Sequence, residues 1–168
     1  MKYIKNSLIA RRPLWVMLFA LLFSACSVSK ETRSMKRNIK GDWVLQTITT
    51  EGITGVAKTT IFNEAEFGCF IGSEWNFVSN NGMGSYNLID RSKDCVTLKR
   101  SIRWSIYEAK DLPAAFQFNR LDDNKNAMAN EDGYKLTITE LDHDHMKLRS
   151  EVAFSGHAGA IIYNFVRK

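Results

Sequence analysis

Residues 74–89 read EWNFVSNNGMGSYNLI, and this stretch decides the fold class of the chain. Trp75 and Phe77 alternate with polar neighbours, which is the period of two expected for a half-buried β-strand. The pair Asn81-Gly82 follows, and Asn-Gly between two alternating segments is a strong signal for a tight hairpin turn. The sequence therefore predicts an antiparallel β-hairpin centred on this turn.

The same alternation recurs outward from this hairpin along most of the chain. The alternating segments are rich in aromatic and β-branched residues, and polar or glycine-containing turns separate them. Roughly eight such strands predict an all-β domain with an antiparallel up-and-down order, and such a sheet can lose its edges by closing into a barrel. A turn or two of helix is expected only near residues 63–67. The predicted strands are residues 43–50, 74–78, 84–89, 102–106, 116–119, 134–139, 146–152 and 160–166.

The alternation also predicts which side chains face the inside of the barrel. An eight-stranded barrel is just wide enough to be filled by its own side chains or to hold one small ligand. The large inner residues could therefore line a pocket for a flat or acyl-chain molecule, or they could simply form the core. Other inner positions are Ile102, Ile106, Leu136, Ile138, Leu148 and Val152. The predicted ligand-binding residues are Trp75, Phe77, Trp104, Phe116, Phe118, Tyr134 and Met146.

The N-terminal segment has the pattern of an export signal. Its first twelve residues carry four basic side chains and no acid, and the apolar run 14–23 follows. Ten apolar residues span about 15 Å as a helix, about half the thickness of a bilayer core. The small residues Ser24 and Ala25 precede Cys26. This arrangement predicts a signal peptide over residues 1–25, cut before Cys26. An ordinary secretory signal with an incidental cysteine is the alternative.

Removing this leader changes the charge of the chain. The whole chain has 23 basic and 18 acidic residues, and the leader holds four of the bases, which leaves 19 bases and a net charge of +1. This near-neutral charge gives no reason to expect nucleic-acid binding, which needs basic residues gathered on one face. Residues 26–40 are polar and are predicted to form a flexible tether. Residues 41–168 form the predicted folded domain.

Three cysteines occur, an odd number. If Cys26 carries a lipid, Cys69 and Cys95 remain, and in an oxidising compartment they can form a disulfide. Two separate free thiols are the alternative. No clustered Cys/His spacing of the kind that zinc sites use is present.

The stretch Gly41-Asp42-Trp43 opens the first predicted strand. A Gly-X-Trp followed by an up-and-down set of strands resembles the lipocalins, and more closely the bacterial lipocalin-like lipoproteins. The resemblance covers residues 40–168, and the Cys26 region is similar to their lipidation signal, although Phe23 replaces the usual leucine. Further matching segments are residues 69–77, 80–86, 116–118, 133–134 and 163–165.

The resemblance implies an eight-stranded lipocalin-like β-barrel that holds a small hydrophobic molecule. It implies a structural role for Gly41 and Trp43 at the closed end of the barrel. It also implies that a basic residue of the last strand, here Arg167, covers Trp43. Finally, it implies an N-terminal lipid on Cys26 as the membrane attachment.

The sequence contains no pattern that indicates catalysis. The stretch His143-Asp144-His145 reads as an exposed, acid-rich turn rather than a metal site, and no nucleophile elbow, HExxH or phosphate loop is present. We therefore expect no enzyme, no cofactor and no metal.

Two functions remain as hypotheses. The first is a monomeric, lipid-anchored protein of the cell envelope that binds or carries a small hydrophobic molecule, on the periplasmic side of the outer membrane. The second is a structural lipoprotein whose filled barrel docks another envelope protein.

Overall fold

The computed structural model describes residues 29–53, 59–89, 95–129, 132–154 and 156–168. Both the predicted signal peptide and Cys26 lie outside these residues. Within the described part, no helix is long and apolar enough to cross a membrane.

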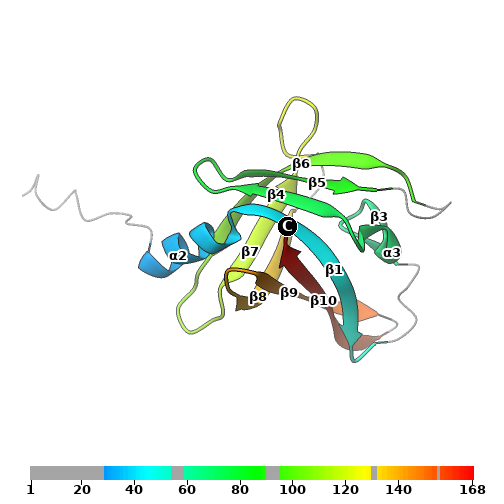
Figure 1. Ribbon diagram of the computed structural model, residues 1–168. Coiled ribbons are helices and arrows are strands. Elements are labelled where there is room, and N and C mark those ends of the chain that lie inside the picture. The colour runs from blue at the N-terminus through cyan, green and yellow to red at the C-terminus, as the bar shows by residue number, and fades with distance from the viewer. Residues whose placement is uncertain (1–28, 54–58, 90–94, 130–131, 155) are drawn as a thin grey trace, which may run out of the picture.

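Eight antiparallel strands form a closed barrel, in the spatial order β1-β10-β9-β8-β7-β6-β5-β4 (Figure 1). Strand β1 closes the barrel by pairing with β4 on one side and β10 on the other. The predicted all-β, up-and-down barrel is therefore confirmed. The strands are β1 (Gly41–Glu51), β4 (Glu74–Val78), β5 (Met83–Leu88), β6 (Leu98–Tyr107), β7 (Ala115–Arg120), β8 (Tyr134–Leu141), β9 (His145–Phe154) and β10 (His157–Arg167).

The hairpin predicted at Asn81-Gly82 joins β4 to β5. Gly82 has a φ of +65°, and a Cβ on it would lie 2.7 Å from the carbonyl oxygen of Trp104. Glycine is required here because the backbone is left-handed and the neighbouring strand lies so close. The same approach lets the Trp104 N–H donate to the Gly82 carbonyl at 2.6 Å.

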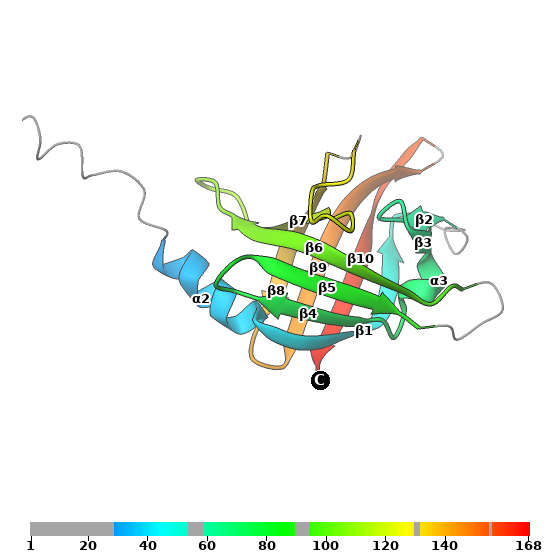
Figure 2. The ribbon, with the colours of Figure 1, turned by 90° about the horizontal axis from the view of Figure 1, so that it is seen from above.

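The prediction of a flexible tether is wrong for residues 30–39, which form helix α2 (Lys30–Ile39). Ser29 caps the helix, and its hydroxyl accepts from the Thr32 N–H at 2.8 Å. Thr32 and Ile39 are buried on one face, seven residues or two helical turns apart. A reading of composition alone missed this sparse buried stripe in a polar segment. Figures 1 and 2 show α2 at one end of the barrel, where it contacts β6 and β8.

A short insertion between β1 and β4 lies at the opposite end of the barrel (Figure 2). It contains strands β2 (Thr60–Ile61) and β3 (Ala65–Glu66), which pair as a hairpin, and helix α3 (Phe67–Phe70). The helix predicted at residues 63–67 is thus displaced towards the C-terminal side.

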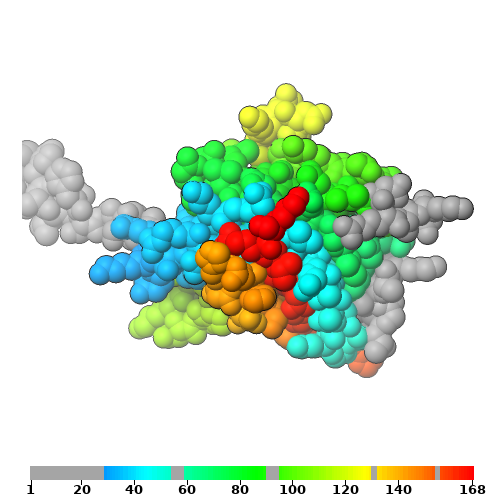
Figure 3. Space-filling view, viewed as in Figure 1, coloured from blue at the N-terminus to red at the C-terminus, as the bar shows by residue number. Residues whose placement is uncertain are grey.

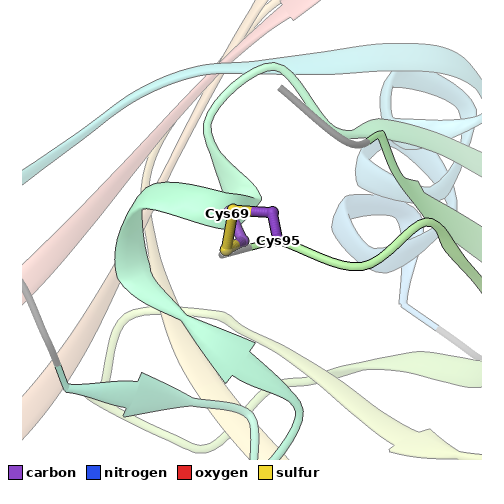
Figure 4. Close-up of a disulfide and its surroundings, with 2 residues drawn as sticks. All are labelled: Cys69 and Cys95. Atoms are coloured by element: carbon purple, nitrogen blue, oxygen red, sulfur yellow. A yellow bond between two sulfur atoms is a disulfide. The ribbon is translucent and has the colours of Figure 1, made fainter. Parts of the chain in front are cut away.

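The predicted disulfide is confirmed (Figure 4). Cys69 of α3 is bonded to Cys95 in the segment that leads into β6, with their Cα atoms 5.5 Å apart. The bond therefore ties the end of the insertion to the barrel wall.

The predicted inner face is also confirmed. All thirteen inner residues named from the alternation belong to the hydrophobic core or pack against it as partly buried side chains. The polar residues between them face outwards, as Arg103, Ser105 and Asn119 do. The core is one continuous cluster that runs from α2 to the insertion.

Candidate ligand site at the mouth of the barrel

The seven residues predicted to bind a ligand, six aromatic residues and Met146, gather in the barrel interior. Six of them are at most 3% exposed, and Tyr134 is half-buried. Their rings touch in series: the Phe77 and Phe116 centroids are 5.3 Å apart, and those of Phe118 and Tyr134 are 5.0 Å apart. These side chains therefore fill the interior in this structure, and their role towards a ligand stays a prediction.

The insertion adds aromatic rings to this group, among them Phe62 and the fully buried Phe70 of α3, whose ring centroid lies 6.5 Å from that of Trp75. Phe62 belongs to the turn between β2 and β3, is only 7% exposed, and was not predicted from the sequence. Its ring stacks on Tyr163 at 5.2 Å. It also meets Phe118 at 5.1 Å and Tyr134 at 5.2 Å edge to face. Phe62 is therefore a plug that the insertion places in the mouth of the barrel.

The backbone of this plug is strained. Phe62 and Asn63 have φ values of 52° and 47°, and the Glu64 N–H donates to the Ile61 carbonyl at 3.1 Å. Two left-handed residues closed by such a bond make a type I′ turn, which favours Asn and Gly. A left-handed conformation costs an ordinary L-residue about 1–2 kcal/mol. The buried ring of Phe62 offsets that cost.

Glu64 holds the plug in place through a buried polar cluster, the Glu64 cluster, which consists of Glu64, Arg100, Arg120 and Tyr86. Arg100 binds the carboxylate with two nitrogens, its Nε at 2.9 Å from Oε2 and its Nη2 at 2.7 Å from Oε1. Arg120 Nη1 and the Tyr86 hydroxyl each donate to Oε2 at 2.6 Å. The Glu64 side chain is 7% exposed and that of Arg120 is 5% exposed. Charge-assisted bonds of this kind are among the strongest in proteins.

The strand register brings the three donors of the Glu64 cluster together. Tyr86 is paired with Arg100 across β5 and β6, and Ile102 is paired with Arg120 across β6 and β7. Arg100 lies two residues from the inward-facing Ile102, and Arg120 lies two residues from Phe118. The period of two therefore places both arginines on the inner face, and extending it by one step beyond the apolar residues would have found them.

The charges of the Glu64 cluster shift its acid–base behaviour. Burial alone would raise the pKa of Glu64, but the hydrogen bonds from Arg100, Tyr86 and Arg120 outweigh it and lower the pKa to about 2. Burial, together with the bond to the carboxylate, raises the pKa of Tyr86. Both arginines are cations at every physiological pH. The cluster therefore holds two positive charges and one negative charge.

The opposite end of the barrel has the arrangement that the resemblance implied. Trp43 is fully buried, and its indole N–H donates to the Ile39 carbonyl of α2 at 2.7 Å. The Arg167 guanidinium lies over the Trp43 ring, 4.4 Å from its centroid. Arg167 also donates to the carbonyls of Lys40 at 2.9 Å and Asn38 at 2.6 Å. This end is closed by structural contacts.

The described surface also has a groove of about 490 Å³ on the outer side of β6, β7 and β8. Arg103, Asn119 and Lys135 line it, so it offers little to a hydrophobic molecule. The predicted turn at residues 143–145 is exposed, and His143 and Asp144 contact each other at 2.6 Å.

No protein-family model and no curated protein matches the sequence. Several solved structures resemble the fold at 12% sequence identity. A bovine odorant-binding protein in complex with a selenium-containing odorant aligns with a TM-score of 0.44, over 86% of this chain and 76% of that protein. Apocrustacyanin C2 aligns with a TM-score of 0.44 over 83% of this chain and 64% of that protein. Apocrustacyanin C1 aligns with a TM-score of 0.42 over 86% and 72%.

Proposed function

We propose that the protein binds a small hydrophobic molecule inside its barrel, entering at the end that the β2–β3 hairpin closes. The observation that carries this proposal is the Phe62 plug. The ring that fills the mouth comes from an insertion outside the barrel wall, so it can leave without breaking a barrel strand. Its departure would expose an aromatic pocket of the kind that suits a flat or acyl-chain ligand.

Native mass spectrometry of the full-length protein after exposure to total lipid extract tests this function. We expect a bound species in the wild type and a larger bound fraction in Phe62→Ala, because the plug no longer competes. Tyr107→Ala is the matched control, since Tyr107 is an aromatic residue that is 43% exposed. Absence of any bound species in both wild type and Phe62→Ala would refute a carrier role.

We further propose that Cys26 carries an N-terminal lipid that anchors the protein in the outer membrane, facing the periplasm. The support is the sequence of the leader together with the disulfide. Cys69 and Cys95 are joined, which fits a protein exported to an oxidising compartment and leaves Cys26 for lipid.

Incorporation of labelled fatty acid in cells tests the anchor. Label should enter the wild type and Cys69→Ser but not Cys26→Ser. Protease treatment of intact cells should leave the domain uncut until the outer membrane is permeabilised. Label on Cys26→Ser would contradict the anchor, and cleavage in intact cells would place the domain on the outside.

The filled interior supports a second candidate function, a structural lipoprotein that docks another envelope protein. Crosslinking in cells should then recover one specific partner with wild type and with Phe62→Ala alike, because the contact would use the outer surface. Failure to recover any partner would count against this function.

A further inference from the structure

The mouth of the barrel contains a ready-made site for an anion. The Glu64 cluster presents four hydrogen-bond donors to one carboxylate, and all come from three neighbouring barrel strands. The insertion supplies the acceptors: the Glu64 carboxylate and the Asn63 carbonyl, to which Arg120 Nη1 also donates at 3.1 Å. The cationic half of the cluster therefore stays in the barrel when the plug moves.

Vacating this site without a replacement would be costly. Arg120 is nearly fully buried, and a buried cation that loses its anion partner is strongly destabilising. Arg100 and Arg120 both pair with the Glu64 carboxylate, so its departure takes an anion partner from two cations at once. An incoming molecule that carries its own carboxylate restores the pairing, and a neutral molecule does not.

Phe62 and Glu64 together present the same two groups as a carboxylic acid with an aromatic tail. Phe62 supplies an aromatic ring among Phe118, Tyr134 and Tyr163, and Glu64 supplies a carboxylate to Arg100 and Arg120. The ring and carboxylate are two residues apart in one turn. The segment thus occupies an apolar subsite and an anionic subsite at once.

Resting on the proposed ligand-binding function, we propose that the physiological ligand is a small monocarboxylic acid with an aryl or acyl tail, and that it displaces an internal mimic formed by Phe62 and Glu64. Arg100, Arg120 and Tyr86 bind the carboxylate of the ligand. The aromatic rings around Phe62 receive its tail. The left-handed turn at Phe62 and Asn63 favours displacement, because leaving the barrel lets the strained backbone relax.

The chain that follows the hairpin is held to the barrel by two contacts. On the C-terminal side, Cys69 is bonded to Cys95, and the Gly72 N–H donates to the Leu45 carbonyl of β1 at 2.7 Å. These contacts separate movement of the hairpin from α3 and the strands that follow it. This arrangement lets the mouth open while the barrel stays closed.

Calorimetric titration of the full-length protein, with detergent-only blanks, tests the assignment. The probes are two matched pairs: phenylbutyrate with phenylbutyramide, and octanoate with octanamide. Each amide keeps the tail and removes the charge. We expect each acid to bind about tenfold more tightly than its amide, the ratio expected when a charged hydrogen-bond partner is lost.

Three variants separate the parts of the site. Glu64→Gln should raise the acid-to-amide ratio by about tenfold because it removes the competing anion. Arg100→Gln should lower the ratio, because it removes two of the four hydrogen bonds to the carboxylate while those from Arg120 and Tyr86 remain. Arg103→Gln is the matched control, an exposed arginine on the outer face of the same strand, and it should leave the ratio unchanged. Phe62→Ala should increase the affinity for the acid and for the amide by the same factor. It replaces Glu64→Gln in the test if that variant does not fold.

The outcomes distinguish this inference from the proposed function. Equal binding of acid and amide in wild type and Phe62→Ala would overturn the carboxylate site while leaving hydrophobic binding intact. An unchanged ratio in Arg100→Gln would overturn the role of the arginine. No binding of any probe to Phe62→Ala would overturn the inference together with a carrier function.

Discussion

Single side chains close the two ends of the barrel through different kinds of contact. At the closed end, Arg167 stacks on Trp43 and donates to the carbonyls of Asn38 and Lys40. Figure 3 shows the C-terminal strand against α2 and the β8–β9 turn, which this arginine joins. At the mouth, Glu64 joins an insertion to the wall through charge. The first contact stabilises the fold, and the second can be exchanged for a ligand.

Replacing Arg167 should therefore destabilise the whole domain. We expect Arg167→Ala to lower the free energy of unfolding by about 2 kcal/mol, because it removes a partly buried cation–π contact and several hydrogen bonds. Arg167→Lys should restore less than half, since an ammonium cannot reproduce the planar fork. Chemical denaturation followed by tryptophan fluorescence measures both. Lys168→Ala, which breaks only an exposed pair with Glu74, should cost less than about 0.5 kcal/mol, and an equal loss in this control would contradict the assignment.

Glu64 should make stability depend on acid pH. Its pKa in the folded state is about 2, against 4.5 for the free side chain. A lowered folded-state pKa means that the stabilisation is complete above pH 4.5 and is lost as the pH falls towards 2. We expect the difference in unfolding free energy between wild type and Glu64→Gln to shrink by about 2–3 kcal/mol across this range. Asp142, whose pKa is lowered by backbone N–H bonds from His145 and Asp144, titrates in both proteins and cancels. Parallel pH profiles for the two proteins would contradict this role.

Helix α2 and the insertion are the elements that close the two ends, and both were hard to predict. The barrel strands were predictable because a period of two is a strong pattern in which each inward residue supports the next. In α2 only Thr32 and Ile39 are buried, so its apolar stripe is too sparse to outweigh its polar composition. The turn at Phe62 and Asn63 was missed because Phe is a poor residue for a left-handed position, and packing across the barrel decides its conformation.

The helix should contribute to stability through its buried stripe. Ile39, the last residue of α2, is fully buried, so Ile39→Ala should cost about 2–4 kcal/mol from lost burial and the cavity left behind. Arg33→Ala, an exposed change on the same helix, should be neutral within about 0.5 kcal/mol. Thermal unfolding by circular dichroism measures both. A neutral Ile39→Ala would mean that the helix is detached from the barrel in solution.

The disulfide should stabilise the insertion against unfolding. It links residues 26 positions apart, and a loop of this length corresponds to roughly 3–4 kcal/mol in the chain-entropy model. We expect Cys69→Ser with Cys95→Ser to lower the unfolding free energy by that amount, and reduction of the wild type to have the same effect. If the reductant lowers the stability of the double variant equally, the effect does not come from this bond.

The whole molecule is a barrel with one permanent end and one exchangeable end. Sequence periodicity predicted the wall and the inward aromatic residues, because it depends on residues near in sequence. The cysteine count predicted the disulfide. The Glu64 cluster depends on register between three strands and on an insertion that folds back across the mouth. Those relations are set by tertiary packing, although the inward positions of Arg100 and Arg120 follow from the period of two.

This difference between the two ends predicts that the mouth opens without unfolding of the barrel wall. Hydrogen exchange of the full-length protein measures the two kinds of opening separately. Amides of the hairpin, such as that of Glu64, should exchange through local opening, whereas the β9–β10 amides should exchange only with global unfolding. In Glu64→Gln, the hairpin amides should exchange at least about tenfold faster, as expected when a charge-assisted bond is lost, beyond any change in the β9–β10 amides. In Ile39→Ala the β9–β10 amides should be accelerated more than the hairpin amides, because that change acts on the closed end and weakens the wall. Equal acceleration of hairpin and wall in Glu64→Gln would mean that the plug is part of the cooperative core, and a ligand could then enter only a partly unfolded barrel.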